Sequence, residues 1–200
     1  MEKNFKETLA ARRSYYAITN SSPVSDKEIE DIIVFAANNV PSAFNSQSAR
    51  IVLLLGEHHK ALWAIVKETL KKIVPESVYS KTEQKVDKSF AAGYGTILFF
   101  EDYAVVEQLE KDFPLYKDNF KGWSLEASGM HQLAVWTMLE SVGFGASLQH
   151  YNPLIDEEVR NKWNLPPTWK LISQMPFGKP LEAPGKKEMQ PIEKRVKIFK

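Results

Sequence analysis

The segment Trp123–Val142, with the sequence WSLEASGMHQLAVWTMLESV, carries the strongest structural pattern in this chain of 200 residues. Its large apolar side chains fall on all sides of a helix and leave hardly any polar face. They are Leu125, Met130, Leu133, Val135, Trp136, Met138 and Leu139. A helix that is apolar on all sides must be buried on all sides. The pattern therefore predicts either a central core helix or a helix that is shared across a dimer interface.

Four apolar runs around this helix predict strands. Ile51–Leu55 and Thr96–Phe100 are short, continuously apolar and rich in branched or aromatic residues, which is typical of buried strands. The second run ends at Glu101–Asp102. Phe144–Gln149 and Trp169–Met175 follow the apolar helix and predict two more strands.

Amphipathic spacing predicts the other helices. The clearest start is the capping box Ser25–Glu28, whose end residues bond to each other's backbone N–H groups. The expected helices cover residues 3–12, 26–36, 62–70, a stretch that ends near 92, and 156–163. The tail from Gly178 is rich in Pro and Lys and is predicted to be extended. Together these elements predict a single α+β domain, residues 1–200, with helices flanking a mixed central sheet and a tail free to reach a neighbouring molecule.

Composition excludes several classes of protein. With 44% hydrophobic and 26% charged residues the chain is typical of a globular domain, and its net charge of +1 gives no basic excess for nucleic acid. No apolar run is long enough to span a bilayer, and the N-terminal residues MEKNFKETLAARRS lack the apolar core of a signal peptide. Because there is no cysteine, neither disulfides nor thiolate metal sites are expected. We therefore expect a cytoplasmic protein without nucleic-acid or membrane partners.

Most catalytic motifs are missing. There is no G-x-S-x-G motif and no cysteine nucleophile, which argues against a hydrolase. The four histidines show no metal-ligand spacing, so no metal is expected, and His58–His59 are expected at a solvated helix start. Gly93–Gly95 precedes a strand and Gly143–Gly145 lacks a third glycine, so neither fits the Rossmann fingerprint.

Polar side chains instead gather in three short segments. Arg12-Arg13-Ser14 ends the first expected helix, and its guanidinium groups suit a phosphate, although Arg also favours a helix C-terminus without any ligand. Ser42–Gln47 lies within VPSAFNSQSARIV just before a strand, where Ser and Asn also serve ordinary turns. Gly145–Asn152, GASLQHYN, is a small-residue turn at a strand end. Each segment has an ordinary structural explanation when it is taken alone.

The order and spacing of these segments resemble the FMN-dependent nitroreductase family. The shared features are R-R-S near the N-terminus, P-S-x-x-N-x-Q after the second expected helix, G-x-G-A-S before a strand end, and G-K-P followed by lysines and P-I-E. The resemblance covers essentially the whole chain. Some segments resemble in particular the small Frm2-like and copper-induced nitroreductases: Arg12–Tyr16, Gly93–Thr96 with Phe99–Asp102, and Leu148–Pro153.

The resemblance implies a nitroreductase-like sandwich that forms a homodimer, with the tail reaching the partner, and a bound FMN. Arg12 and Ser14 would hold the FMN phosphate or ribityl chain, and Lys187 would reach the phosphate. In the family the P-S-x-x-N-x-Q turn lines the flavin, often from the partner subunit, and side-chain amides match the carbonyl and N–H groups of the ring edge. The corresponding residues here are Pro41, Ser42, Asn45 and Gln47. The residues that would pass near flavin N5, mostly through backbone groups, are Gln149, His150 and Tyr151.

Two positions depart from the family pattern. Many relatives carry Lys or Arg, near the pyrimidine side of the flavin, where this chain has Tyr16, and the tail position of Met189 is often Arg. The phosphate would therefore lack one expected cation, which Arg13 or Arg195 would have to supply. Lys88 is a candidate for a further lysine near the pyrimidine side.

The resemblance also implies a reaction, in which NADH or NADPH reduces FMN and hydride passes from flavin N5 to a nitroaromatic or quinone-like acceptor. The cofactor then carries the chemistry, so no catalytic side chain is expected from the protein. Two alternatives remain open: a flavin-binding regulatory or stress protein with little turnover, and an enzyme that breaks down or dehalogenates one particular metabolite. Phe44 and Tyr151 could stack on a flat substrate or belong to the core.

Overall fold

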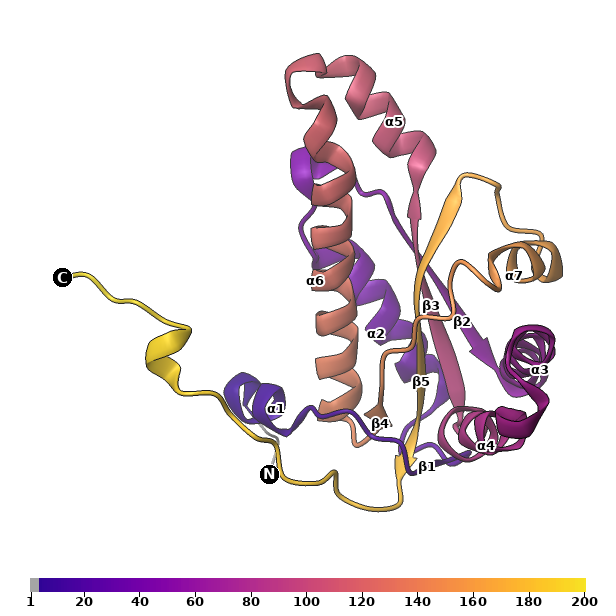
Figure 1. Cartoon of the computed structure of the whole chain (residues 1–200). Coiled ribbons are helices and arrows are strands. Elements are labelled where there is room, and N and C mark those ends of the chain that lie inside the picture. The colour runs from indigo at the N-terminus through magenta and orange to yellow at the C-terminus, as the bar shows by residue number, and fades with distance from the viewer. Residues whose placement is uncertain (1–3) are drawn as a thin grey trace.

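The structure is a computed structural model that describes residues 4–200, and it places a sheet between two layers of helices (Figure 1). Position 3 of the expected helix 3–12 lies outside the described residues. In chain order the elements are α1 (Phe5–Ala11), β1 (Ile18–Thr19), α2 (Asp26–Asn39), η1 (Ala43–Asn45), β2 (Ala49–Leu55), α3 (Gly56–Ile73), α4 (Glu76–Val86), the π-helix η2 (Asp87–Ala91), β3 (Gly95–Asp102), α5 (Tyr103–Asp112), η3 (Pro114–Asn119), α6 (Phe120–Ser141), β4 (Gly145–Ala146), α7 (Asp156–Lys162), β5 (Trp169–Pro180) and η4 (Ile192–Lys194). Within residues 4–200, no helix is both long and apolar enough to cross a membrane.

The sheet has the strand order β1-β5-β3-β2, and β4 pairs with β5. Its strand pairs are antiparallel and one parallel bridge joins Ser14 to Ala146, so the sheet is mixed, as the sequence predicted. All eight residues of β3 are buried, which confirms the buried strand expected at Thr96–Phe100. β2 lies at an edge of the sheet, and only Leu54 of its seven residues is buried. The expectation of a fully buried strand at Ile51–Leu55 is therefore wrong.

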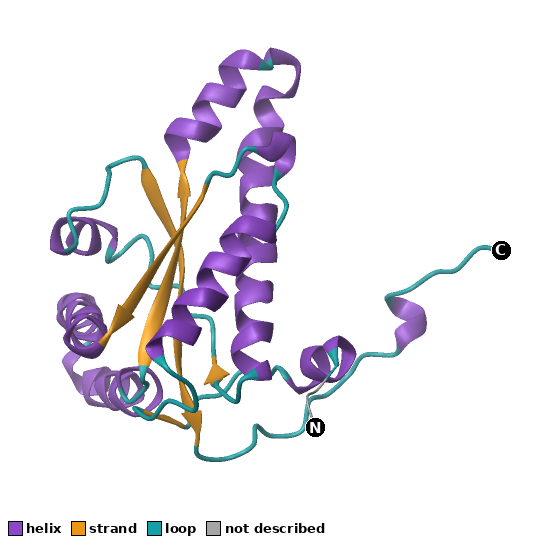
Figure 2. Ribbon diagram, turned by 180° about the vertical axis from the view of Figure 1, so that it is seen from behind, coloured by secondary structure: helices purple, strands orange, loops and turns teal. Residues whose placement is uncertain are grey.

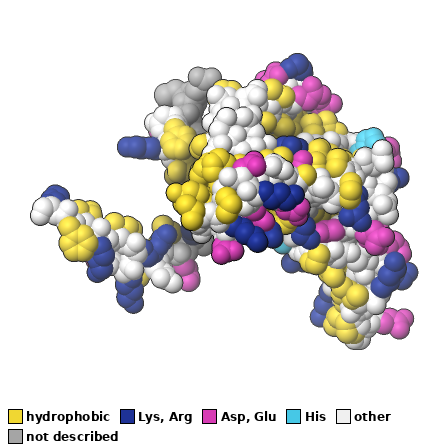
Figure 3. All heavy atoms as spheres, turned by 90° about the horizontal axis from the view of Figure 1, so that it is seen from above, with side chains coloured by type: hydrophobic (Ala, Val, Ile, Leu, Met, Phe, Trp, Pro, Cys, Tyr) yellow, Lys and Arg dark blue, Asp and Glu magenta, His cyan; other side chains and the backbone are white. Residues whose placement is uncertain are grey.

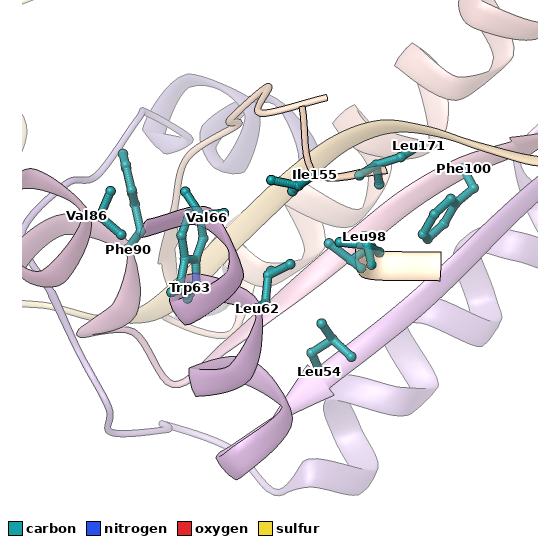
Figure 4. Close-up of a cluster of buried hydrophobic side chains, with 11 residues drawn as sticks. Leu54, Leu62, Trp63, Val66, Val86, Phe90, Leu98, Phe100, Ile155 and Leu171 are labelled. Carbon is teal, nitrogen blue, oxygen red and sulfur yellow. The ribbon is translucent and has the colours of Figure 1, made fainter. Parts of the chain in front are cut away.

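Helices cover both faces of the sheet, and each face has its own hydrophobic core (Figure 2). On one face α3, α4 and α7 pack against β2, β3 and β5. Figure 4 shows this cluster, in which Trp63 and Phe90 lie close together, with ring centroids 5.1 Å apart. Leu98 of β3 and Leu171 of β5 are among its strand residues, and both are fully buried. Side chains of this size contribute about 1.5–3 kcal/mol each when they are buried.

The other face of the sheet is covered by α2 and α6. The capping box predicted at Ser25 begins α2: Ser25 Oγ accepts from Glu28 N–H, and the Glu28 carboxylate accepts from Ser25 N–H. Val135 and Leu139 of α6 belong to this core, but Leu133 on the outer side of the same helix is 45% exposed. Within one chain α6 is therefore not buried on all sides. The single-chain core therefore explains only part of its apolar surface.

The helical segment between β3 and α6 was not predicted from the sequence. β3 continues through Glu101 and Asp102, where the strand was expected to end. The Asp102 carboxylate then caps α5 by accepting a hydrogen bond from Ala104 N–H (3.2 Å). Val106 of α5 is buried behind this cap. An acidic residue directly before apolar residues at helical spacing was the signal for this helix.

The C-terminal part of the chain differs from expectation at the strand after α6 and at the start of the tail. β4 is shorter than the strand expected at Phe144–Gln149, although Gln149 forms an isolated bridge with Gln174. β5 runs on to Pro180, so the chain is still in the sheet at Gly178, where the extended tail was expected to begin. Beyond β5 the tail passes α1 and projects away from the body, with Lys and Arg side chains along it (Figures 1 and 3).

Candidate functional site

A cavity of about 540 Å³ lies where the chain leaves α1 and where the tail passes it. Residues 12–17 form one wall and residues 182–187 form the other. The charged residues that line it are Arg12, Arg13, Lys186, Lys187 and Glu182. Because four cations face one carboxylate, the cavity suits a ligand with several negative charges. The structure thus brings Arg12, Arg13, Ser14, Tyr16 and Lys187 together, as the resemblance implied.

Arg12 is held by packing, and its Nε donor has no partner among the described residues. It is the C-cap residue of α1, and its guanidinium carbon lies 4.3 Å from the ring centroid of Trp136 in α6. This cation–π contact fixes the plane of the guanidinium. Arg12 Nε is buried and has no hydrogen-bond partner within residues 4–200. A buried donor without a partner costs free energy, which a ligand in the cavity would recover.

Arg13 and Arg195 are placed differently. Arg13 Nη2 donates a hydrogen bond to Gly185 O (2.7 Å), so this side chain ties the tail to the wall of the cavity. Lys187, two residues further along, lines the same cavity. Arg195 follows η4 in the exposed arm and does not line the cavity. Of the two candidate replacement cations, Arg13 is therefore the one that the structure brings to the site.

The first and third polar segments meet at β4. Tyr15 N–H donates to Ala146 O (2.9 Å) beside the parallel bridge between Ser14 and Ala146. The backbone at Gly145 approaches the Tyr15 ring so closely that a Cβ atom would lie 2.7 Å from a ring carbon. Glycine is therefore required at position 145 for Tyr15 to pack there.

An aromatic chain continues the contact between these two segments. The ring of Tyr16 lies 6.3 Å from that of Phe90, and Phe90 lies 6.3 Å from Tyr151. Phe90 belongs to the π-helix η2, a rare turn that often occurs at functional sites. Lys88, the candidate for a pyrimidine-side lysine, is exposed on the same turn. The π-helix therefore carries Phe90, whose ring links the first and third polar segments, and the exposed Lys88.

The segment Gln149–Tyr151 is held by Gln174 of β5. Gln149 N–H donates to Gln174 O (2.7 Å), and Tyr151 N–H donates to Gln174 Oε1 (2.8 Å). Burial raises the pKa of the Tyr151 hydroxyl to about 12, so this group remains neutral. Its ring also lies 5.9 Å from Trp63, which shows that Tyr151 packs against the core. His150 between these residues is exposed.

The second polar segment lies at the other end of α6 (Figure 1). We call residues 42–47 the amide turn. Phe44 packs against Phe120 and Trp123 near the start of α6, whereas Arg12 packs on Trp136. Trp123 and Trp136 are separated by about 20 Å along the axis, because a helix rises about 1.5 Å per residue. Pro41, Ser42, Asn45 and Gln47 therefore do not reach the cavity of their own chain.

The amide turn has an unusual backbone. Phe44, Asn45 and Gln47 have positive φ angles of 55°, 51° and 48°. Ser42 does serve the turn, because its Oγ accepts a hydrogen bond from Gln47 N–H (2.9 Å). The side-chain amides of Asn45 and Gln47 are exposed and make no hydrogen bond within residues 4–200. Strained backbone that presents unused polar groups is common at ligand sites.

Two buried titratable groups were not found from the sequence. His59 was expected to be solvated, but it is buried, and its ring nitrogens bond to Thr96 Oγ1 (2.9 Å) and Ala91 O (3.1 Å). Burial lowers the pKa of His59. Glu101 is also buried, and burial raises the pKa of its carboxyl group to about 7. Within residues 4–200 no three His, Cys, Asp or Glu side chains form a group that could hold a metal ion.

Comparison with known proteins defines the class of protein to which this site belongs. Residues 9–179 match the Nitroreductase family. The chain is 34% identical to the putative nitroreductase HBN1 of Saccharomyces cerevisiae, over 98% of this chain and 96% of that protein. The structure of the nitroreductase CinD from Lactococcus lactis in complex with chloramphenicol is 41% identical, with a TM-score of 0.90 over 98% of this chain and 100% of CinD. A putative nitroreductase from Exiguobacterium sibiricum in complex with FMN shares the fold at 15% identity, with a TM-score of 0.73 over 98% of both chains.

These matches and the fold define an oxidoreductase. The chain belongs to the Nitroreductase family. The resemblance seen in the sequence is confirmed, and so is the expected fold of helices around a mixed sheet.

Proposed function

We propose that the protein is an FMN-dependent oxidoreductase that uses NADH or NADPH to reduce nitroaromatic or quinone-like compounds. The observation that carries this proposal is the cationic cavity beside α1, which is lined by Arg12, a residue whose buried Nε has no hydrogen-bond partner within residues 4–200. It lies at the position in the sequence where the family places the FMN phosphate. The FMN in the solved Exiguobacterium relative supports the choice of cofactor.

The residues in the cavity fit a flavin mononucleotide. Arg12, the Ser14 hydroxyl and Lys187 would bind the phosphate, since charge-assisted bonds to phosphate are about twice as strong as neutral ones. Arg13 holds the tail in place through Gly185 O, so it acts on the phosphate mainly through its charge. When bound, FMN supplies a ring that takes a hydride from a nicotinamide and gives it to an acceptor.

The site requires a second copy of the chain. Large apolar side chains remain exposed on α1, α2 and α6: Phe5, Val34, Phe35, Leu125, Met130 and Leu133. Some of them line an apolar cavity of about 450 Å³ between α1, α2 and α6. Exposed apolar surface of this kind marks an interface. In a homodimer built on this face, the amide turn of one subunit would complete the cavity of the other, and the tail arm would reach its partner.

The acceptor would enter beside the amide turn. Phe44 lies in an aromatic cluster with Phe113, Tyr116 and Trp123, and its ring is about half exposed. Flat aromatic compounds stack on such rings. The CinD structures contain chloramphenicol and 4-nitrophenol, which are nitroaromatic compounds. We therefore place this protein's acceptors in the same chemical class.

The test is a reduction and reoxidation experiment on the FMN-loaded protein. Under anaerobic conditions NADH or NADPH should bleach the flavin within seconds, and 4-nitrophenol or a benzoquinone should restore its absorbance. The Arg12→Ala variant, which is expected to bind FMN more weakly, is measured in excess FMN as the control for flavin occupancy. A protein that cannot be reconstituted with FMN would refute the cofactor assignment. Flavin that is bound but not bleached would favour a flavin-binding regulatory protein.

A further inference from the structure

The motif Phe99–Asp102 has no part in the cofactor cavity, yet it places a buried carboxyl group directly behind the amide turn. The Glu101 side chain is fully buried (0% exposed). Its Oε2 accepts a hydrogen bond from Ser48 Oγ (2.6 Å), and its Oε1 has no partner within residues 4–200. Ser48 directly follows Gln47, the last residue of the turn. The carboxyl group therefore contacts the residue at which the turn enters β2.

Further hydrogen bonds join the same strand end to the turn. Ser48 Oγ also lies 3.4 Å from Ser46 Oγ, and Ser48 O accepts from Asp102 N–H (2.9 Å). Arg50 donates to Gln47 O (2.8 Å) and forms an ion pair with Asp102 (3.0 Å). The C-terminal half of the amide turn is thus linked to the end of β3 indirectly, through Ser48 and Arg50.

The turn needs such support because its conformation is unfavourable. Non-glycine residues in the left-handed region cost about 1–3 kcal/mol each, and this turn contains three of them. A buried carboxyl group is itself costly, and an apolar side chain of the same volume is often more stable. Glu101 therefore has an energetic reason to be present only if its contact with Ser48 serves another purpose.

We propose that Glu101 is a positioning residue that fixes the amide turn through Ser48, and thereby sets where Asn45 and Gln47 present their side-chain amides to the flavin edge. Glu101 itself touches neither cofactor nor substrate; it acts through Ser48. This inference rests on the proposed function, because it assigns the amides a ligand in the partner's cavity.

Ionisation of Glu101 controls the strength of this contact. An ionised carboxylate accepts a charge-assisted hydrogen bond, which is about twice as strong as a neutral one. Burial raises the pKa of Glu101 to about 7, against the lowering effects of the Ser48 hydroxyl and Arg50. The other charged and titratable groups on β2, β3, β5 and α6, the elements around Glu101, are Arg50, Asp102, Lys170, Lys179, Lys121, Glu126, His131 and Glu140. The turn should therefore be held more firmly above neutral pH than below it.

Hydrogen–deuterium exchange of the FMN-loaded protein tests the contact without measuring activity. In Ser48→Ala and Glu101→Leu, the protection factors of the amides of residues 45–47 should fall roughly tenfold at pH 8.5, where a bond to a charged group is lost, and by less at pH 6, where the lost bond is mostly neutral. Glu101→Gln keeps a neutral acceptor, so it should match the wild type at pH 6 and fall below it at pH 8.5. Ile97→Val, on the same strand and the same face, is the control and should leave the turn unchanged. Unchanged protection in Ser48→Ala would overturn the proposal.

Steady-state kinetics then test the consequence for the site. Ser48→Ala and Glu101→Leu should raise KM for 4-nitrophenol several-fold with a smaller change in kcat, whereas Ile97→Val should alter neither. The double variant Ser48→Ala/Glu101→Leu should be no worse than either single variant, because both remove one contact. Loss of protection without any change in KM would refute the positioning role and leave the FMN oxidoreductase assignment standing. Failure of NADH to reduce the flavin would instead reject that assignment, while the exchange data would still report on the contact.

Discussion

The two ends of α6 carry the two halves of the proposed site, and they are built in opposite ways. At the Arg12 end the backbone is ordinary, and charged donors line a cavity that has its own walls. At the amide-turn end the backbone is strained, the amides face solvent, and the support comes from buried groups behind them. A phosphate can be held by charge alone, whereas the edge of a ring must be met by amides in defined positions. In the proposed site the first half would therefore be preformed in one chain, whereas the second would depend on Glu101 and on a partner subunit.

The largest effect is expected from a substitution that should prevent dimerisation and so keep the two halves of the site apart. Leu133→Asp places a carboxylate in the apolar face of α6, where an uncompensated buried charge costs about 3–5 kcal/mol. The dimer dissociation constant should rise more than a hundredfold. Sedimentation velocity measures this effect, and FMN retention should fall with it.

Val78→Asp is the matched control for this substitution. Val78 lies on α4, on the opposite face of the sheet, and its exposure of 44% is close to the 45% of Leu133. It should leave both the dimer and the flavin unchanged. A Leu133→Asp protein that remains dimeric and retains FMN would show that the two halves do not meet across this face.

The next prediction concerns the free energy of unfolding, which ionisation of the buried Glu101 carboxyl group should lower. The pKa of this carboxyl group is about 7 in the folded protein and near 4.5 in the unfolded chain, so the folded state binds more protons between these values. The free energy of unfolding should therefore fall as pH rises through this window, by about 3 kcal/mol in total. Glu101→Gln should lack this decrease, and Ile97→Val should retain it.

Denaturant unfolding at several pH values between 4.5 and 8 measures this difference. The local and global effects of Glu101 then have opposite signs: ionisation strengthens the bond to Ser48 and weakens the protein as a whole. A Glu101→Gln variant with the same pH dependence as the wild type would show that Glu101 titrates at its ordinary value.

Local patterns in the sequence predicted those parts of the molecule that local physics determines. The capping box at Ser25 depends on neighbouring residues only, and it is confirmed; the buried strand at Thr96–Phe100, which is visible as a local apolar run, is confirmed as well. Whether a strand lies at the centre or the edge depends on what pairs with it, and so the burial of Ile51–Leu55 was wrongly predicted. The burial of His59 was missed for the same reason, because its partner Thr96 lies on a distant strand.

In the candidate site, too, the features that local sequence determines could be predicted and those that depend on distant residues could not. The segments around Arg12 and Asn45 were recognised as motifs, because their order and spacing are visible in the sequence. That they lie at opposite ends of one helix could not be predicted, since this separation depends on the length and direction of α6. Glu101 appeared at a strand end and within the segment Phe99–Asp102 that resembles the Frm2-like subgroup, but with no role for its side chain. Its role depends on the contact with Ser48, which lies 53 residues earlier in the chain.

A third prediction compares the contributions of the two arginines at the phosphate end of the site to FMN binding. Arg12→Ala should weaken FMN binding more than Arg13→Ala, because Arg13 donates to Gly185 O whereas Arg12 has a buried donor without a partner in the part of the chain that the structure describes. Loss of one charge-assisted contact costs about 1.5–3 kcal/mol, or roughly ten- to a hundredfold in affinity. Titration of the apoproteins with FMN decides this. Equal losses, or a larger loss for Arg13→Ala, would reverse the assignment of the two arginines.

The smallest expected effect concerns Tyr16, where the cationic half of the site carries a neutral residue in place of the cation that many relatives have. Tyr16 lines the cavity and is 50% exposed, so it can be replaced without opening a core. A reduced flavin bears more negative charge than an oxidised one, and a nearby cation therefore raises its potential. A unit charge at about 4 Å with an effective dielectric near 20 contributes roughly 4 kcal/mol, and desolvation of the lysine and loss of the Tyr contact would offset about half.

The remainder of about 1.4–2 kcal/mol predicts a midpoint potential roughly 30–45 mV higher in Tyr16→Lys. Spectroelectrochemistry of the two FMN-loaded proteins measures it. Tyr16→Phe is the control, because it keeps the ring that packs beside Phe90 and adds no charge. A Tyr16→Lys protein that binds FMN with an unchanged or lower potential would place Tyr16 away from the ring, and the cationic half would then hold the phosphate alone.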